Sequence, residues 1–397
     1  MRVSTRSLQL QFLAALGQQQ ARLAKIQQQA ATGKKVSTAG DNPAAAVQIV
    51  RLENALAQLA GYETNAGIAQ GRLSLEEQAL NNTVNALQRV RDLIIDARGP
   101  GRTSAELDII ASEVGEVLEG LFDTANSQDG EGRFLFAGNR VQTQPFAVSG
   151  GAVTYSGDQG VRTQRISESR TVQEGDSGAD VFQHVRSGNG TFRVLSSATN
   201  AGNAFYGETS VIDPAAWDRQ AYTITFTAPD SYEVRDGGGA LVASGAYQSA
   251  DAIAFRGISV GFEGTPAAGD AFTVEPSRFQ SVFDTVQQFV GALSTDVGTP
   301  TARAQFQSAT NGVLLDLDRA LEHISEVRSR VGQRLSVIEE QRSSNDRFSI
   351  EVQEVLSRAQ DADLASIITE LESQAFAIET AQATFARIQG RSLFDFL

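Results

Sequence analysis

The sequence predicts an α+β protein of elongated shape. Its N- and C-terminal parts are expected to form a long antiparallel helical rod, or coiled coil, with a β-rich domain inserted mid-chain. Three observations predict this fold: heptad spacing of apolar residues towards both ends, strand-like alternation in the middle, and opposite charges at the two ends. Residues 1–40 contain six basic residues and no acid, whereas residues 357–397 contain three basic and six acidic residues. Such segments are expected to attract each other.

The first predicted element is a helix over residues 7–32, with a narrow apolar seam flanked by glutamines. Two heptad rows make up this seam: Phe12, Leu16, Leu23 and Ile26. Gly33 is expected to end the helix. Asp41 or Asn42 can then accept hydrogen bonds from the free amides of the next helix, and Pro43 fits its first turn.

The second helix is predicted to be long, because apolar residues recur every seven positions from Leu52 to Ile94 and Gly99 and Pro100 then stop the pattern. A third helix is expected to start at Thr103, which can form a capping box with Glu106. Residues 132–138 are a short apolar run between glycines, which predicts a strand or hairpin.

Strand patterns dominate residues 142–276. Tyr222, Ile224 and Phe226 alternate with threonines, and Gly237–Gly239 suits a hairpin turn between two strands. Helical spacing returns near Phe279 and breaks at 361–363. The last helix, residues 364–390, carries a second seam. Its members are Leu364, Ile367, Leu371, Ile378, Phe385 and Ile388.

We therefore expect three regions. Residues 1–40 and 357–397 would form a terminal coiled coil, called here the assembly region. Residues 41–141 and 277–356 would form a helical rod domain with a short β-hairpin. Residues 142–276 would form an outer β-rich domain. An isolated amphipathic helix is marginal in water, so each terminal seam needs a partner, from the other end of the chain or from neighbouring copies. An ordinary intramolecular bundle is the alternative for the long helices.

Composition argues against several function classes. The net charge of −14 is unsuited to non-specific binding of nucleic acid, and no apolar run is long enough to span a membrane. The chain has no cysteine and only two histidines, which leaves little for metal, cofactor or nucleophile chemistry. We expect no catalytic, cofactor or metal site, and no enzyme. We also expect no cleaved signal peptide; a transit peptide is the competing interpretation of the acid-free N-terminus.

Several motifs resemble a known family. Residues 30–36, followed by Asp41, Asn42 and Pro43, resemble the N-terminal signature of bacterial flagellins and their hook-associated relatives, in which Asp-Asp often stands where this chain has Asp-Asn. Residues 132–138 and the ending 392–397 are similar to motifs of the hook-associated protein 3 members of that family. The first of these motifs contains Arg133, Phe134, Leu135 and Phe136. The resemblance covers about residues 1–140 and 277–397.

The resemblance implies a structural component of the bacterial flagellum at the junction of hook and filament. It implies export by the flagellar type III apparatus and an extracellular location. The implied partners are the first hook-associated (junction) protein, flagellin, copies of the same chain in a ring layer, and a cytoplasmic export chaperone. Two alternatives remain: flagellin itself, or a β-rich glycan-binding domain on a coiled-coil stalk.

Overall fold

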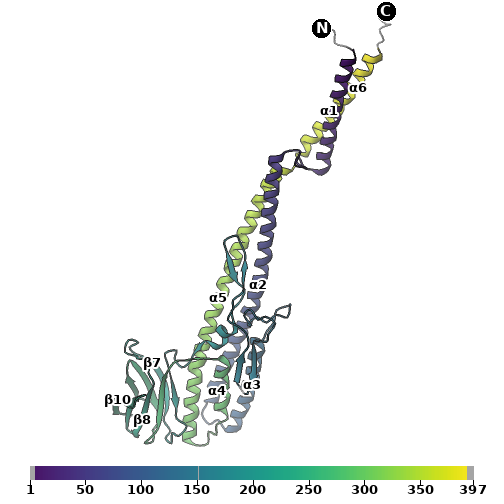
Figure 1. Cartoon of the computed structure of the whole chain (residues 1–397). Coiled ribbons are helices and arrows are strands. Elements are labelled where there is room, and N and C mark those ends of the chain that lie inside the picture. The colour runs from purple at the N-terminus through teal and green to yellow at the C-terminus, as the bar shows by residue number, and fades with distance from the viewer. Residues whose placement is uncertain (1–4, 151, 391–397) are drawn as a thin grey trace, which may run out of the picture. The chain divides into compact units, whose positions relative to one another are not determined.

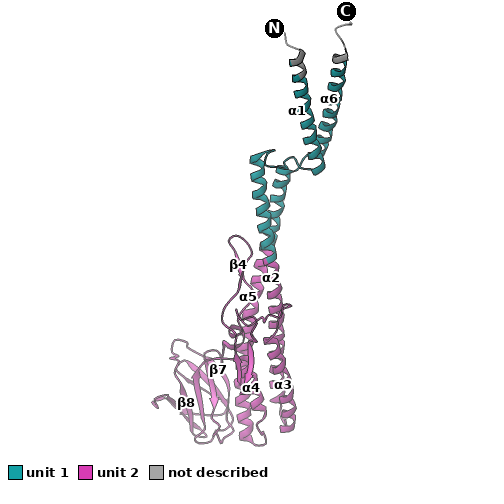
Figure 2. Ribbon diagram, turned by 45° about the vertical axis from the view of Figure 1, so that its right-hand side comes forward, with its two compact units in different colours: residues 1–64, 341–397 teal, residues 65–340 magenta. Residues whose placement is uncertain are grey.

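The computed structural model describes residues 5–150 and 152–390, without the side chains at positions 5, 6, 8, 9 and 388–390. Two compact units divide the chain, as Figure 2 shows in two colours. The first unit comprises residues 1–64 and 341–397, and the second comprises residues 65–340. The predicted division into three regions at 40, 141, 276 and 356 stays a prediction.

Helices occupy both terminal parts of the chain and strands occupy its middle, which confirms the α+β class (Figure 1). The helices are α1 (Thr5–Thr32), α2 (Pro43–Ala97), α3 (Ser104–Ala125), α4 (Val282–Leu293), α5 (Pro300–Gln360) and α6 (Leu364–Gly390), with a π-helix η1 (Ala179–Gln183). The capping box predicted at Thr103 is confirmed: its side chain accepts from the Glu106 amide, and the Glu106 carboxylate accepts from the Thr103 amide.

The heptad row of α2 is completely buried within the second unit. It comprises Ala66, Leu73, Leu80, Leu87 and Ile94. A matching row of α5, comprising Leu317, Ile324, Val331 and Ile338, is buried to the same degree and belongs to the same hydrophobic core. The sequence period therefore identifies the faces of the two long helices that bury apolar surface.

The strands are β1 (Phe146–Ser149), β2 (Ala152–Tyr155), β3 (Thr163–Arg165), β4 (Thr171–Gln173), β5 (Val185–Arg186), β6 (Phe192–Ser196), β7 (Phe205–Val211), β8 (Tyr222–Ala228), β9 (Ser231–Asp236), β10 (Leu241–Ala246), β11 (Ala252–Phe255), β12 (Ile258–Glu263), β13 (Ala271–Pro276) and β14 (Phe279–Gln280). A five-stranded sheet, in the order β10-β9-β8-β13-β6, and a three-stranded sheet, β11-β12-β7, share one core. Phe262 of the smaller sheet packs against Phe226 and Phe272 of the larger one, at 5.4 and 4.8 Å between ring centroids. These two sheets form a β sandwich.

The hairpin turn predicted at Gly237–Gly239 joins β9 to β10 and is confirmed. The middle of the chain, however, belongs to two cores. The β sandwich has its own core between residues 192 and 274, whereas Phe146, Ile166 and Val172 pack into the core of the helices. The strands β1–β4 are therefore additions to the helical body.

Of the strand or hairpin predicted over residues 132–138, the structure has no strand and one antiparallel bridge, closed by the turn 129–133. Within this run, only Phe134 forms a β-bridge, with Gln128. Two backbone bonds flank this bridge: the Asp129 amide donates to the Arg133 carbonyl, and the Leu135 amide donates to the Ser127 carbonyl. The pairing stops there, and the Phe136 carbonyl accepts from the Gly178 amide instead. The run is a compact loop because its apolar side chains enter the helical core rather than one face of a sheet.

In the described part of the chain, none of the helices is long and apolar enough to cross a membrane. Nor do the described histidine, aspartate and glutamate side chains gather in a group that could hold a metal ion.

Candidate assembly interface

The helices α1 and α6 pack antiparallel in the first unit (Figure 1). The rings of Phe12 and Phe385 stack with their centroids 4.3 Å apart and their planes 3° apart. Nearer the middle of the two helices, the Gln374 side chain donates to the Gln19 carbonyl. The seams expected at the two ends of the chain therefore face each other within one molecule.

The predicted seam residues differ in burial. Ile26, Ile367 and Ile378 are buried, and four more are half-buried: Phe12, Leu16, Leu23 and Phe385. Leu371 is half-buried as well, whereas Leu364 is 49% exposed. The side chain of Ile388 lies outside the described residues. The contact is thus shallow, with three buried seam residues over two helices of more than six turns each.

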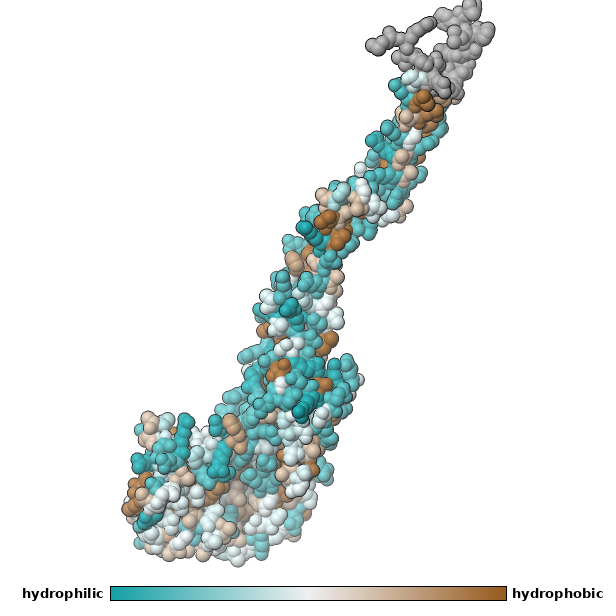
Figure 3. Space-filling model, in the orientation of Figure 1, coloured by the Kyte–Doolittle hydropathy of each residue, from teal (hydrophilic) through white to brown (hydrophobic). Residues whose placement is uncertain are grey.

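A two-helix pair cannot cover all of its apolar surface, and here a second set of apolar side chains points to solvent. It comprises Leu10 and Leu13 of α1 with Leu364, Ile368 and Phe376 of α6. Phe376, at 71%, is the most exposed of them. Apolar patches accordingly interrupt the hydrophilic surface of the first unit (Figure 3). Exposed apolar area of this kind marks a contact surface for other molecules.

The helices α1 and α6 carry charges of opposite sign. Residues 5–32 contain only basic charged residues, whereas α6 contains three glutamates and one arginine. Arg22 of α1 and all three glutamates of α6 are exposed, and among the described side chains no ion pair joins α1 to α6. The pair therefore presents one basic and one acidic helix.

The predicted cap before α2 is divided between two residues. The Asn42 side chain accepts from the Ala45 amide at 3.1 Å and caps α2, while Asp41 accepts from the Thr38 amide and pairs with Lys25 at 2.9 Å. The Lys25 ammonium, helped by the Thr38 and Ser37 amides, holds the pKa of the Asp41 carboxyl well below its usual range. Asn42 and Asp41 thus order the turn between α1 and α2, and Pro43 opens α2.

The two helix breaks are bonded to each other. The Lys35 amide donates to the Gln360 carbonyl at 2.8 Å, and the Ala362 amide donates to the Gly33 carbonyl at 2.9 Å. Gly33 has a φ of +66°, which glycine adopts without strain. The α1–α2 turn and the α5–α6 turn therefore form one structural joint.

The motif 132–138 lies in the second unit, where it fixes an aromatic cluster. Phe136 is completely buried and packs edge-on against Phe182, with ring centroids 5.1 Å apart. Leu135 is buried and Phe134 is half-buried. Arg133 pairs with Asp129 at 2.9 Å and closes the turn before the motif.

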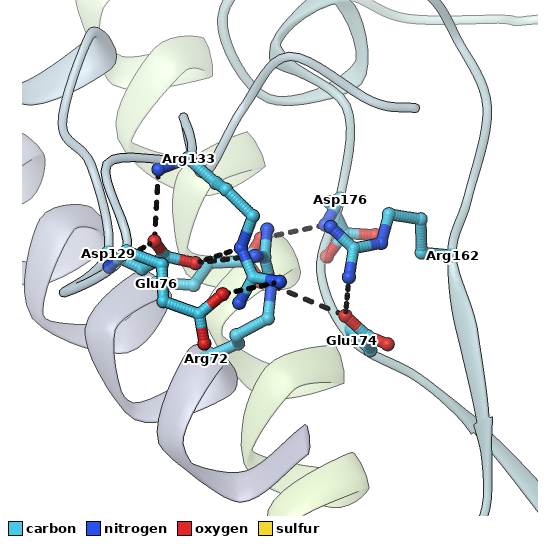
Figure 4. Close-up of polar contacts among 8 residues, drawn as sticks. Arg72, Glu76, Asp129, Arg133, Arg162, Glu174 and Asp176 are labelled. Atoms are coloured by element: carbon cyan, nitrogen blue, oxygen red, sulfur yellow. Dashed lines mark hydrogen bonds and ion pairs between the residues drawn. The ribbon is translucent and has the colours of Figure 1, made fainter. Parts of the chain in front are cut away.

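A buried ionic cluster anchors this turn (Figure 4). Arg72 of α2 lies 2.7 Å from Asp129 and 3.4 Å from Glu174, and Glu174 also pairs with Arg162 at 2.8 Å. The side chains of Arg72, Asp129 and Glu174 are less than 8% exposed. The cluster therefore joins α2, the turn before the motif and the β3–β4 hairpin.

Comparison with known proteins identifies the family. The family model of the bacterial flagellin N-terminal helical region matches residues 3–141. Over 187 residues, 47% of this chain, the sequence is 32% identical to flagellar hook-associated protein 3 of Salmonella typhimurium, of which the match spans 58%. The crystal structure of Xanthomonas campestris FlgL is 32% identical and superimposes with a TM-score of 0.73, over 77% of this chain and 99% of that one. The chain belongs to the FlgL family.

A second structure supports the assignment to the FlgL family. The flagellar junction protein FlgL from Legionella pneumophila is 30% identical, with a TM-score of 0.73 over 80% of this chain and 100% of that one. The motifs that resemble this family therefore have structural roles in the FlgL fold: Asp41 and Asn42 order a joint, and Arg133 and Phe136 anchor a core.

The ionic cluster of this FlgL-family chain is not predicted above, although the sequence contains one signal of buried charge next to Arg72. A second heptad row of α2 contains Ala69, Glu76, Thr83 and Val90, all of them buried. Glu76 therefore occupies a core position and requires polar partners. Its Oε1 accepts from the Asp176 amide at 3.0 Å, and Asp176 pairs with Arg334 at 2.8 Å.

Glu76→Gln is expected to stabilise the chain at neutral and alkaline pH. Burial and the neighbouring Asp176 carboxylate raise the pKa of Glu76 well above its ordinary value of 4.5. A carboxyl with a raised pKa binds its proton more tightly when folded, so its stabilising contribution is present at low pH and lost as the pH rises through the folded pKa. Urea unfolding from pH 4.5 upwards measures the free energy of unfolding of the variant, which should exceed that of the unmodified chain by an amount that grows with pH. An excess that stays constant with pH would contradict the raised pKa of Glu76.

Proposed function

We propose that this chain is a structural component of the bacterial flagellum that forms the junction layer between the hook and the flagellin filament. The observation that carries the proposal is the α1–α6 pair, which leaves apolar side chains of both helices exposed in a family of hook-associated proteins. On this proposal the chain has a mechanical role and is not an enzyme. It would act outside the cell after type III export.

Neighbouring copies of the chain are the first proposed partners. One copy offers a basic helix, α1, and an acidic helix, α6, each with exposed apolar residues. Such a pair fits head to tail, with α1 of one copy against α6 of the next, and a head-to-tail contact generates a ring when the rotation closes. The apolar residues Leu13 and Ile368 would then become buried between copies.

The remaining partners follow from the position of a junction layer. We propose contacts with the first hook-associated protein on the hook side and with flagellin on the filament side. Before export, a cytoplasmic chaperone would cover the exposed apolar face of α6, which carries Ile368 and Phe376. All three contacts would use surfaces that a single copy leaves open.

Gene deletion and imaging test the proposed location. Cells without this chain should release flagellin into the medium and bear hooks without filaments, whereas cells without flagellin should release none. An antibody against residues 142–276 should label one band at the end of the hook. Label along the whole filament would favour flagellin itself, and specific glycan binding by the full chain on an array would favour the glycan-binding alternative.

Amide hydrogen exchange on the isolated protein gives a further prediction. Amides of α1 and α6 are expected to exchange much faster than those around Leu317 and Ile324 of α5, because the shallow α1–α6 contact opens more readily than a completely buried core. Mass spectrometry at low protein concentration measures this difference. Equal protection of the two regions would show that the terminal helices are stable without assembly partners.

A further inference from the structure

The two sheets of the β sandwich have four edge strands, and three of them are protected. β6 lines a cavity of about 400 Å³ together with α4 and α5. On β7, the Tyr206 carbonyl accepts from the Asn311 side chain of α5 at 2.6 Å. β11 has four residues and lies between two charged residues, Asp251 and Arg256. Helices, shortness and flanking charge are the usual protections of a sheet edge.

β10 is not covered by a helix of the described chain, and it is longer than β11. The nearest charged residues along the chain, Asp236 and Asp251, lie five positions from its ends, and its pairing with β9 is irregular between Leu241 and Ala243. The strand has six residues, and no charged residue or proline occurs from position 241 to position 250. Leu241 is 54% exposed. Among the described residues, the β10 backbone bonds only to β9, so the amides and carbonyls on its other side are free. In Figure 1, β10 lies on the side of the β sandwich away from α5.

The surroundings of this edge are acidic. Residues 192–276 contain four arginines and ten carboxylates, a net charge of −6. Asp236 precedes β10 and Asp251 follows it, while Arg235 is paired with Glu233. A strand added to β10 would therefore lie along an uncharged backbone edge, with the carboxylates of Asp236 and Asp251 beyond its two ends.

We propose that β10 accepts an extended strand of a protein partner in which a short uncharged segment lies between basic residues. Main-chain hydrogen bonds to the free edge of β10 would hold the strand, and the basic residues would pair with the carboxylates at its ends. A second copy of this chain is a poorer occupant, because its own β10 lies in a sandwich of the same negative charge. The surface goes beyond the proposed junction role, since α1 and α6 take no part in it.

The test uses the full-length chain and two synthetic peptides. Both alternate threonine and valine; one is flanked by lysine pairs and the other by glutamate pairs. The lysine peptide should bind saturably by fluorescence anisotropy and the glutamate peptide at least about tenfold more weakly, with the difference shrinking at high salt. Cross-linking with mass spectrometry should place the bound lysine peptide at β10.

Proline variants of adjacent β10 residues provide the matched control. Ala243 and Ser244 pair with Val234 and Glu233 of β9, and neighbouring amides point to opposite sides of a strand. One of Ala243→Pro and Ser244→Pro therefore removes an outward amide, keeps the β9 ladder and should weaken peptide binding at least about tenfold. Trp217 fluorescence identifies the variant that keeps the sandwich core intact.

Results of three kinds would overturn the proposal. The first is no saturable binding of the lysine peptide. The second is equal binding of the two peptides at low salt, or equal affinity in the folded proline variant. The third is a dimer of the unmodified chain in sedimentation that the folded proline variant abolishes, which would make a second copy the occupant of the edge.

Discussion

Ile378→Asp is expected to abolish assembly of the chain into flagella while leaving the second unit folded. Ile378 is buried in the α1–α6 contact, which no ion pair joins among the described side chains. An unpaired charge at this position should cost about 3 kcal/mol per subunit, a factor of about 100 in the assembly equilibrium. Electron microscopy of the hook ends and release of flagellin into the medium measure the loss.

Two further variants of α6 distinguish an effect on the α1–α6 pair from an effect on the contact between copies. Ile368→Asp changes an exposed apolar residue, so it should leave the α1–α6 pair intact and still impair assembly. Ser373→Asp adds the same charge at an exposed polar position and should have little effect. Normal flagella with Ile378→Asp, or equal defects with Ser373→Asp, would show that the apolar surface of α6 does not drive assembly.

The long helices were predictable because their signal is local. A heptad period in α2 and α5 identifies the buried rows from the sequence alone, and the structure buries Leu73 and Leu317 as the period requires. The same period places Glu76 in the core. Its partners could not be predicted, since Asp176 and Arg334 lie 100 and 258 positions away along the chain.

Residues 132–138 show why the strand prediction failed. An apolar run between glycines is compatible with a strand, but a strand also needs a neighbouring backbone, and sequence spacing gives no sign of one. Here the neighbours are Ser127 and Gly178, which bond single groups of the run. Similarly, alternation predicted the strands after residue 192, whereas the packing of Phe146 against Phe283 of α4 depends on the tertiary fold.

Arg72→Ala is expected to destabilise the second unit by about 3 kcal/mol, because it removes one of the two cations that each of two buried carboxylates contacts, leaving only Arg133 at Asp129 and Arg162 at Glu174. Arg72 is the side chain shared by Asp129, in the turn before the motif, and Glu174, after the β3–β4 hairpin. Losing it should release both segments from α2. Urea unfolding followed by far-UV circular dichroism measures the free energy of unfolding, and hydrogen exchange of residues 129–136 reports the release of the motif.

The control for this prediction is Arg89→Ala on the same helix. Arg89 pairs with Glu113, but their side chains are 52% and 42% exposed, so the loss should be below about 1 kcal/mol. Adding Glu174→Gln to Arg72→Ala should recover part of the lost stability, because it removes the negative charge that Arg72 no longer balances in the buried cluster. If Arg72→Ala and Arg89→Ala cost the same, or if Glu174→Gln gives no recovery, the ionic cluster does not hold the motif. The aromatic core around Phe136 would then be its anchor.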